Sequence, residues 1–241
     1  MIRFWKSVRQ KMLSENKFSK YLLYAVGEIF LVVIGILIAV QINTYYNAQR
    51  DRHLETTCLE NLKEDLQIEL AVIREQLDHE AQIIARVDSC FLAFDSVLSN
   101  LELSTMLQNL CTRRTFVANK AAFNNMVNTG DIVLITNSDL QNAMVRYYQQ
   151  LDYTAAVINN NNLFVIDSQF GAFVESNGFG FRMNSDGEVD ESYRLSPEKR
   201  FTLNSELIAR KKASVSIARL SQLQLEATME LIALLNEELN R

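Results

Sequence analysis

The chain has very little of the residues that interrupt helices. It contains one proline and seven glycines, and neither type occurs between Gly35 and Gly130. Because proline and interior glycine disfavour helices, their scarcity predicts long helices and an all-α fold. Four of the seven glycines and Pro197 fall within residues 170–200. We therefore expect an irregular insert there, a small Gly-rich loop or hairpin.

Signatures of catalysis and metal binding are also scarce. The two histidines, His53 and His79, lie far apart on one helical stretch without the further ligands that a zinc site needs, so we interpret them as exposed helix residues. The sequence has no Gly-rich phosphate loop and no GxSxG motif. Its acidic stretch NSDGEVDE lacks the full ligand pattern of a calcium loop. We predict a protein that is not an enzyme and that has no cofactor and no metal site.

Cysteine is limited to three residues, Cys58, Cys90 and Cys111, and none forms a CxxC pair. This spacing argues against a redox motif or a zinc ribbon. Cys58 lies on an apolar stripe, where it is either a small buried apolar residue or a partner for the same cysteine of a second copy.

One long apolar run, Tyr21–Ile42, dominates the N-terminal part of the chain. Twenty-two helical residues extend about 33 Å, enough to cross a hydrocarbon core of roughly 30 Å. The run is too long for the apolar region of a cleaved signal peptide and has no small-x-small site at its end. We predict a transmembrane helix over residues 21–42.

Basic residues flank this run unevenly. Six Lys or Arg residues precede it within residues 1–20, whereas only Arg50 and Arg52 follow within the next twenty residues. The positive-inside rule therefore places the N-terminus in the cytoplasm and residues 43–241 on the far side, which in a bacterium is the periplasm. Residues 1–20 are predicted either as an amphipathic interfacial helix or as a simple basic flank of the span.

The exported part is acidic. Residues 43–241 hold 18 of the 24 Lys and Arg residues and 27 of the 29 Asp and Glu residues, so they carry about nine net negative charges. An acidic domain argues against nucleic acid as a partner. The predicted partners are the lipid bilayer, further copies of the chain, and an envelope protein complex.

A single carboxyl, Glu28, lies inside the predicted span and is costly there unless it is neutral or paired. It shares a helical stripe with Ala25, Gly35 and Ala39, and small residues on one stripe permit two helices to approach closely. We predict an oligomerisation seam with Glu28 as its polar contact. In the alternative, Glu28 reaches the headgroups, or it exchanges protons as in a proton-driven accessory subunit.

The remainder is predicted as a helical bundle. A long membrane-proximal helix over residues 43–100 has an apolar seam in steps of three and four from Ile73, and its opposite faces include Glu69 and Glu80. Residues 101–241 form the helical ectodomain. The longest helices there are expected after the N-caps Ser138 and Ser196. Shorter helices are predicted over 103–110 and 119–127.

The opening SENKFSKYLLYAVGEIFLVVIGILIAVQIN resembles the start of a large family of uncharacterised single-span membrane proteins from Bacteroidota. The block TGDIVLITNSDLQNAMVRYYQQL, at Thr129–Leu151, is similar to a second recurring block of that family. The resemblance implies an inner-membrane location and makes Gly27, Glu28 and Gly35 part of the family pattern. It implies no activity. The chain departs from the pattern at Tyr45-Tyr46, where an Asn-Trp type pair is expected.

These observations leave two kinds of function. The first is a non-enzymatic, membrane-anchored helical protein that acts as an oligomeric scaffold or as a subunit of an envelope complex. The alternative is a periplasmic ligand-sensing or proton-coupled accessory subunit that uses Glu28. A sensor would need a partner for its output, because only about twenty residues are predicted in the cytoplasm.

Overall fold

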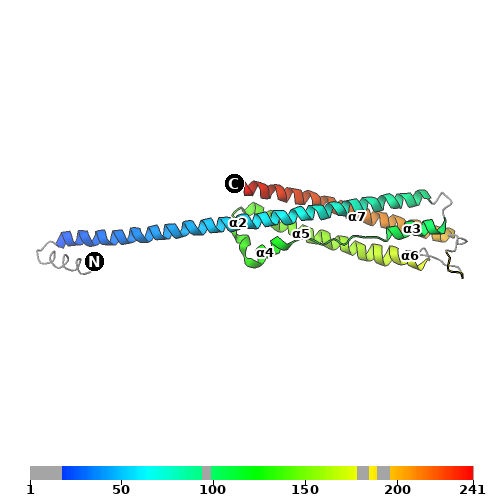
Figure 1. Cartoon of the computed structure of the whole chain (residues 1–241), viewed down its shortest axis with the longest axis horizontal. Coiled ribbons are helices and arrows are strands. Elements are labelled where there is room, and N and C mark those ends of the chain that lie inside the picture. The colour runs from blue at the N-terminus through cyan, green and yellow to red at the C-terminus, as the bar shows by residue number, and fades with distance from the viewer. Residues whose placement is uncertain (1–17, 94–98, 178–184, 189–195, 241) are drawn as a thin grey trace. The chain divides into compact units, whose positions relative to one another are not determined.

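The computed structural model describes residues 18–93, 99–177, 185–188 and 196–240, and these contain helices, turns and loops but no β-strand. The predicted all-α fold is therefore confirmed (Figure 1). The chain divides into two compact units, with the boundary between Glu55 and Thr56.

The first unit contains the beginning of helix α2, Phe18–Ala93. Within it, Tyr21–Ile42 is apolar and almost entirely exposed, and by length and composition the helix can span a membrane. The core helix of a soluble protein passes the same test but is mostly buried, whereas none of the most apolar stretch of α2 is buried. This part of α2 therefore packs against no apolar core formed by the described residues.

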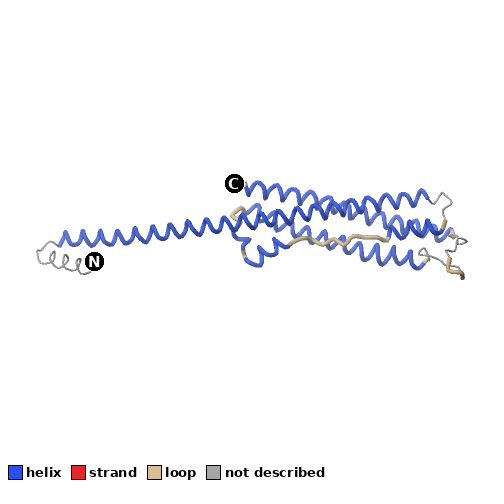
Figure 2. Tube along the Cα trace, in the orientation of Figure 1, coloured by secondary structure: helices blue, strands red, loops and turns tan. Residues whose placement is uncertain are grey.

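The second unit is a bundle of helical legs. The first leg is α2 from Thr56 onward, and the last is the long helix α7, Pro197–Leu239. The helices between them are α3 (Asn100–Leu110), α4 (Ala121–Thr129), the 3₁₀ helix η1 (Asp131–Leu134), α5 (Ser138–Asn161), the π-helix η2 (Asn162–Gly171) and α6 (Ala172–Ser176). Between α3 and α4, residues 111–120 run extended along the bundle, as Figure 2 shows.

Two apolar clusters form the core and fix the directions of the legs. In the larger cluster, Leu59 to Ile73 of α2 pack with Leu140 to Ile158 of α5 and with Ile217 to Leu235 of α7. The smaller cluster joins later residues of α2 to earlier residues of α7. Its buried members are Ile83, Val87, Cys90, Leu107, Leu110, Phe170, Val174, Leu203 and Leu207. The numbering thus rises along α5 as along α2 and falls along α7, so α7 is antiparallel to both.

Polar side chains begin the helices. Ser99 and Glu102 form a reciprocal capping box at the start of α3, and Ser196 accepts a hydrogen bond from the Lys199 N–H with Pro197 in the first turn of α7. The cap of α5 is Asn137, whose side chain accepts from two backbone N–H groups. Our assignment of Ser138 was therefore one residue late. The helix predicted over 119–127 is observed as α4.

The prediction for α2 is wrong about which charged residues face solvent. Glu69 and Glu80, assigned to the solvent faces, are 0% and 1% exposed. Buried residues of α2 recur in regular steps of four and three, and polar residues occupy some of these positions. In order they are Leu59, Leu62, Leu66, Glu69, Ile73, Gln76, Glu80, Ile83, Val87 and Cys90. Spacing of this kind is typical of a coiled-coil-like seam.

The irregular insert begins later than predicted. Residues that we expected in a loop from residue 170 belong to η2 and α6, which extend the α5 leg to Ser176. Of the insert itself, the structure describes a turn at residues 185–188, where Gly187 has a φ of 79°. The rest of the predicted loop or hairpin, residues 178–184 and 189–195, lies outside the described residues.

The π-helix η2 explains a change of spacing in the α5 leg. Buried residues before it recur in steps of four and three, but Ile158, Asn162, Ile166, Phe170 and Val174 recur strictly every four. A π-helix has wider turns than an α-helix, so a four-residue step keeps side chains on one face for longer. The π-helix ends at Gly171, where an added Cβ atom would lie 3.1 Å from the Ile166 carbonyl oxygen.

Candidate functional site

The structure places all four residues of the predicted span seam on α2. Ala25 is half-buried, and Glu28, Gly35 and Ala39 are exposed. A Cβ atom added to Gly35 would meet nothing within 4 Å. The carboxyl group of Glu28 forms no hydrogen bond or ion pair with a described residue. Among the described residues the seam is thus an open stripe that no other side chain covers.

The second unit contains a polar network that the sequence analysis did not predict. It surrounds the extended residues 111–120. Arg210 is completely buried and donates hydrogen bonds to the carbonyls of Leu110 (2.8 Å) and Thr112 (3.1 Å), and to the hydroxyl of Ser214 (2.6 Å). A cation at the carboxyl end of α3 satisfies carbonyls that the helix leaves unpaired and complements its dipole.

Asparagines of the α5 leg hold the middle of the extended segment. The Asn159 side chain accepts from the Phe116 N–H (3.0 Å) and donates to the Phe116 carbonyl (2.9 Å). Asn162, 3% exposed, donates to the Arg114 carbonyl (2.7 Å). The run Asn159–Asn162, in which helix propensity alone indicates a weak point, thus supplies hydrogen bonds to a backbone that has no helical or sheet partner.

Carboxylates of α2 hold the end of the segment. The buried Glu69 accepts from the Asn119 N–H (2.8 Å), and Asp65 accepts from the Ala122 N–H (2.7 Å) in the first turn of α4. Three ion pairs border the segment at the surface: Arg113–Asp167, Arg114–Glu75 and Lys120–Asp152. Exposed pairs of this kind contribute little, so the buried groups carry most of the stability of this leg.

Further polar residues lie in the core between α5 and α7. The hydroxyls of Tyr147 and Thr228 are 2.9 Å apart, and Thr154 donates to the Gln224 side chain at 3.2 Å. Burial raises the pKa of Tyr147 to about 12, although its bonds to Thr228 and Gln224 act in the other direction. The neighbouring Tyr148 stacks on the Phe123 ring with 4.1 Å between centroids, and burial raises the pKa of its phenol too.

Several buried polar atoms in this core have no hydrogen-bond partner among the described residues. They are Glu69 Oε1, His79 Nε2, Glu80 Oε2, Tyr148 Oη, Asn162 Oδ1, Ser221 Oγ and Gln224 Nε2. Burial raises the pKa of the Glu69 carboxyl, while the Asn119 N–H bond opposes that rise. Buried carboxyls without full pairing are costly, so this core is less stable than an apolar core of the same size.

His79 is not the exposed residue that we expected. It is half-buried. Burial lowers the pKa of its imidazole, and the nearby charge of Glu80 opposes that shift. Within the described residues no three His, Cys, Asp or Glu side chains are grouped closely enough to hold a metal ion. Cys58 and Cys111 are half-buried free thiols, and burial raises the pKa of Cys90 to about 11. Thiols with raised pKa values are poor nucleophiles at neutral pH.

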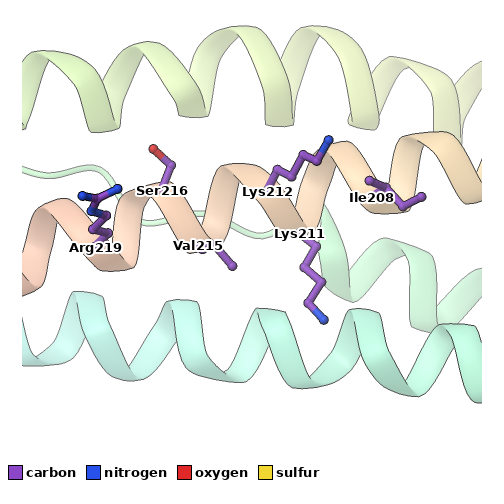
Figure 3. A pocket seen from close by; sticks show the side chains of 6 residues that line it. All are labelled: Ile208, Lys211, Lys212, Val215, Ser216 and Arg219. Atoms are coloured by element: carbon purple, nitrogen blue, oxygen red, sulfur yellow. The ribbon is translucent and has the colours of Figure 1, made fainter.

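The outer side of α7 carries a shallow hollow with mixed chemistry. Its lining residues are Ile208, Lys211, Lys212, Val215, Ser216 and Arg219. In Figure 3, Lys211 and Val215 point toward α2, whereas Lys212 and Ser216 point toward the α5 leg. Lys211 forms an ion pair with Asp88 of α2. An open, cationic and partly apolar surface of this kind resembles a contact surface more than an enclosed ligand pocket.

A model of a family of unknown function, DUF6090, matches residues 28–196, which is more than half of the chain. The chain therefore belongs to this family. The match covers most of the apolar span and of the α2, α3, α4 and α5 legs, and it ends where α7 begins. Searches of curated proteins and of solved structures found no match.

Proposed function

We propose that this DUF6090 protein is a non-enzymatic, membrane-anchored helical protein that assembles into oligomers and acts as a scaffold or as a subunit of an envelope complex. In this proposal Tyr21–Ile42 crosses the bacterial inner membrane, the N-terminus is cytoplasmic, and the bundle is periplasmic. The uneven distribution of basic residues around the span supports this orientation.

One observation carries the proposal. The apolar helix is not covered by any residue that the structure describes, and one stripe of it holds Glu28 together with small residues. In a lipid environment an uncovered carboxyl is expensive, and a second helix with the same stripe can share a hydrogen bond with it. The bundle supports a structural role, because Arg210, Asn162 and Glu69 hold its own backbone with buried hydrogen bonds.

Cysteine cross-linking in native membranes tests the seam. In a full-length chain whose three native cysteines are replaced, Ala39→Cys should form a disulfide-linked dimer on mild oxidation. Leu37→Cys, on the opposite side of the same turn, is the matched control and should remain monomeric. Equal cross-linking at both positions, or none at either, would contradict the seam.

A second variant pair separates a neutral polar contact from a proton-exchanging group. Glu28→Gln should preserve the Ala39→Cys cross-link, because an amide can also form a hydrogen bond between two helices. Gly35→Leu should abolish it, because a large side chain keeps the backbones apart. If Glu28→Gln removes a proton-dependent phenotype and leaves assembly intact, the proton-coupled alternative is favoured instead.

A further inference from the structure

The outer face of α7 carries exposed apolar residues at heptad spacing. Phe201, Ile208 and Val215 are 74%, 46% and 49% exposed and lie seven residues apart, and Met229, 52% exposed, continues the same phase two heptads later. Apolar residues at this spacing form a helical stripe, interrupted here by the exposed Gln222, of the kind that packs against another helix. No described part of the chain covers it.

The charges beside this stripe differ sharply along α7. Apart from the buried Arg210, residues 199–219 contain five Lys or Arg residues and a single Glu, whereas residues 220–240 contain no Lys or Arg and four Glu residues, of which Glu238 is buried. Lys212 and Arg219 are exposed and form no ion pair with a described residue. A basic band on a domain with about nine net negative charges favours an acidic partner.

The chain itself carries a matching surface on α2. Opposite its buried seam, α2 exposes Ile68 (51%) and Leu92 (78%) together with the acidic residues Glu64 and Asp78, and with Glu75, which is already paired with Arg114. Asp78 forms no ion pair with a described residue. This outer stripe of α2 is therefore acidic and partly apolar, so its charge is opposite to that of the basic band of α7.

The two surfaces also match in height along the bundle. The ion pair between Lys211 and Asp88 sets the level of α7 against α2 within one copy. Measured from that pair at 1.5 Å per residue, Arg219 lies about 12 Å and Asp78 about 15 Å toward the same end of the bundle.

Two apolar pairs follow the same register. Met229 and Ile68 lie about 27 and 30 Å from the ion pair in that direction, and Ile208 and Leu92 lie about 4.5 and 6 Å from it in the other direction. Copies that are related by rotation about an axis parallel to the helices stay level, so each pair would meet across a contact.

We propose that the outer face of α7 in one copy packs against the outer stripe of α2 in a second copy, with Arg219 facing Asp78, Met229 facing Ile68, and Ile208 facing Leu92. The inference rests on the proposed function, that the chain assembles, and adds which surfaces of the second unit meet. A parallel contact between two α7 helices is disfavoured, because it brings one basic band against the other. Since the contact joins two different surfaces, each copy retains one free α7 face and one free α2 stripe, and closure gives a ring.

Charge reversal tests the contact in the full-length chain. In detergent micelles, Arg219→Glu and Asp78→Arg should each weaken self-association about tenfold, because each places like charges opposite one another. The double variant restores opposite charges and should associate within about threefold of the parent. Sedimentation equilibrium at low salt measures all four proteins, and the parent should weaken as salt is raised.

The matched control is Arg146→Glu, which reverses an exposed arginine on α5 outside both surfaces. It should leave association unchanged, and thermal melts should show that every variant folds. Unchanged association in both single variants overturns the inference, and so does a double variant that is weaker than either single variant.

The test also separates this inference from the proposed function. If the parent chain is an oligomer that Gly35→Leu disrupts and Arg219→Glu does not, the span seam stands and the contact between α7 and α2 is excluded. If the parent chain is monomeric at every concentration tested, both proposals fail together.

Discussion

The two units of the chain place polar and apolar residues in opposite ways. In Tyr21–Ile42 the apolar side chains face outward, and the one carboxyl, Glu28, is exposed with them. In the second unit the buried positions of α2 and α7 include Glu69, Glu80 and Arg210. Helical spacing tells which residues share a face. Whether that face is buried against other helices or left exposed depends on the rest of the fold.

The difference follows from what each part must satisfy. A membrane helix pairs all its backbone groups internally, so its surface can be purely apolar. The second unit includes an extended segment, residues 111–120, whose N–H and carbonyl groups find no partners in a ladder, and buried polar side chains provide those partners. The part of the polar core that surrounds residues 111–120 is therefore the consequence of one leg that is only partly helical.

The largest effect is expected at the residue that most defines this polar core. Arg210→Met removes the cation that binds the carbonyls of Leu110 and Thr112 and leaves the buried Glu80 without it. Loss of one partner in a buried charged network costs about 3–5 kcal/mol of unfolding free energy. Urea denaturation measures the change. Lys212→Met on the exposed side of the same helix should change it by less than about 0.5 kcal/mol, and equal losses would show that the charge of Arg210 is not specifically required.

A smaller loss of stability is expected at Asn159, whose side-chain amide forms the hydrogen bonds that a neighbouring β-strand would otherwise provide. Asn159→Ala removes both hydrogen bonds to Phe116 and should lower the unfolding free energy by about 2 kcal/mol. The Phe116 amide should also lose its protection from hydrogen exchange. Asn160→Ala, one residue away and exposed, is the control and should leave that protection unchanged.

The buried carboxyl Glu69 is expected to make stability depend on pH. Burial raises the pKa of Glu69 in the folded state, so its favourable contribution is full below the unfolded pKa, near 4.5, and is lost as the pH rises through the folded pKa. Glu69→Gln should therefore raise the unfolding free energy by about 1 kcal/mol at pH 7 and leave it nearly unchanged at pH 4. Glu64→Gln is the exposed control. A loss of stability in Glu69→Gln at pH 7 would show that the charged form is the favoured one.

The smallest effect on stability is expected at the start of α7, because unpaired N–H groups in a first helical turn need a cap whether the helix is buried or exposed. Ser196→Ala removes the hydroxyl that accepts from the Lys199 N–H and should cost about 1 kcal/mol. Thermal melts can resolve this against Ser216→Ala, an exposed serine in the middle of α7 that should be neutral. No difference between the two variants would mean that the first turn of α7 contributes nothing to the stability of the bundle.

Much of the fold could be predicted from the sequence. The absence of Gly and Pro after Gly35 indicated that α2 continues unbroken beyond the apolar run, and the Ser196-Pro197 pair marked the start of α7 correctly. The polar core was missed because Glu69 and Glu80 were assigned by their charge. Their positions continue the steps of three and four set by Leu62, Leu66 and Ile73, so strict attention to spacing would have placed them inside.

The extended segment and its ligands could not have been predicted in the same way. Asn159 and Asn162 bind residues more than forty positions earlier in the chain, and no local pattern encodes such a contact. The α5 leg continues as a π-helix for a related reason. Its wider turns depend on which neighbours the leg must face, and local propensity does not specify them. The span seam involves a surface that the described residues leave open, so it stays a prediction.

The π-helix η2 also has a consequence for how the α5 leg tolerates changes of length. A wide turn holds one residue more than an α-turn, so loss of a single residue from Asn162–Gly171 can be absorbed by converting one wide turn into an ordinary one. The same loss from Ser138–Asn161 would rotate every later side chain by about 100° and turn the buried stripe away from its neighbours. Family members that differ by one residue in this leg should therefore place the gap within η2.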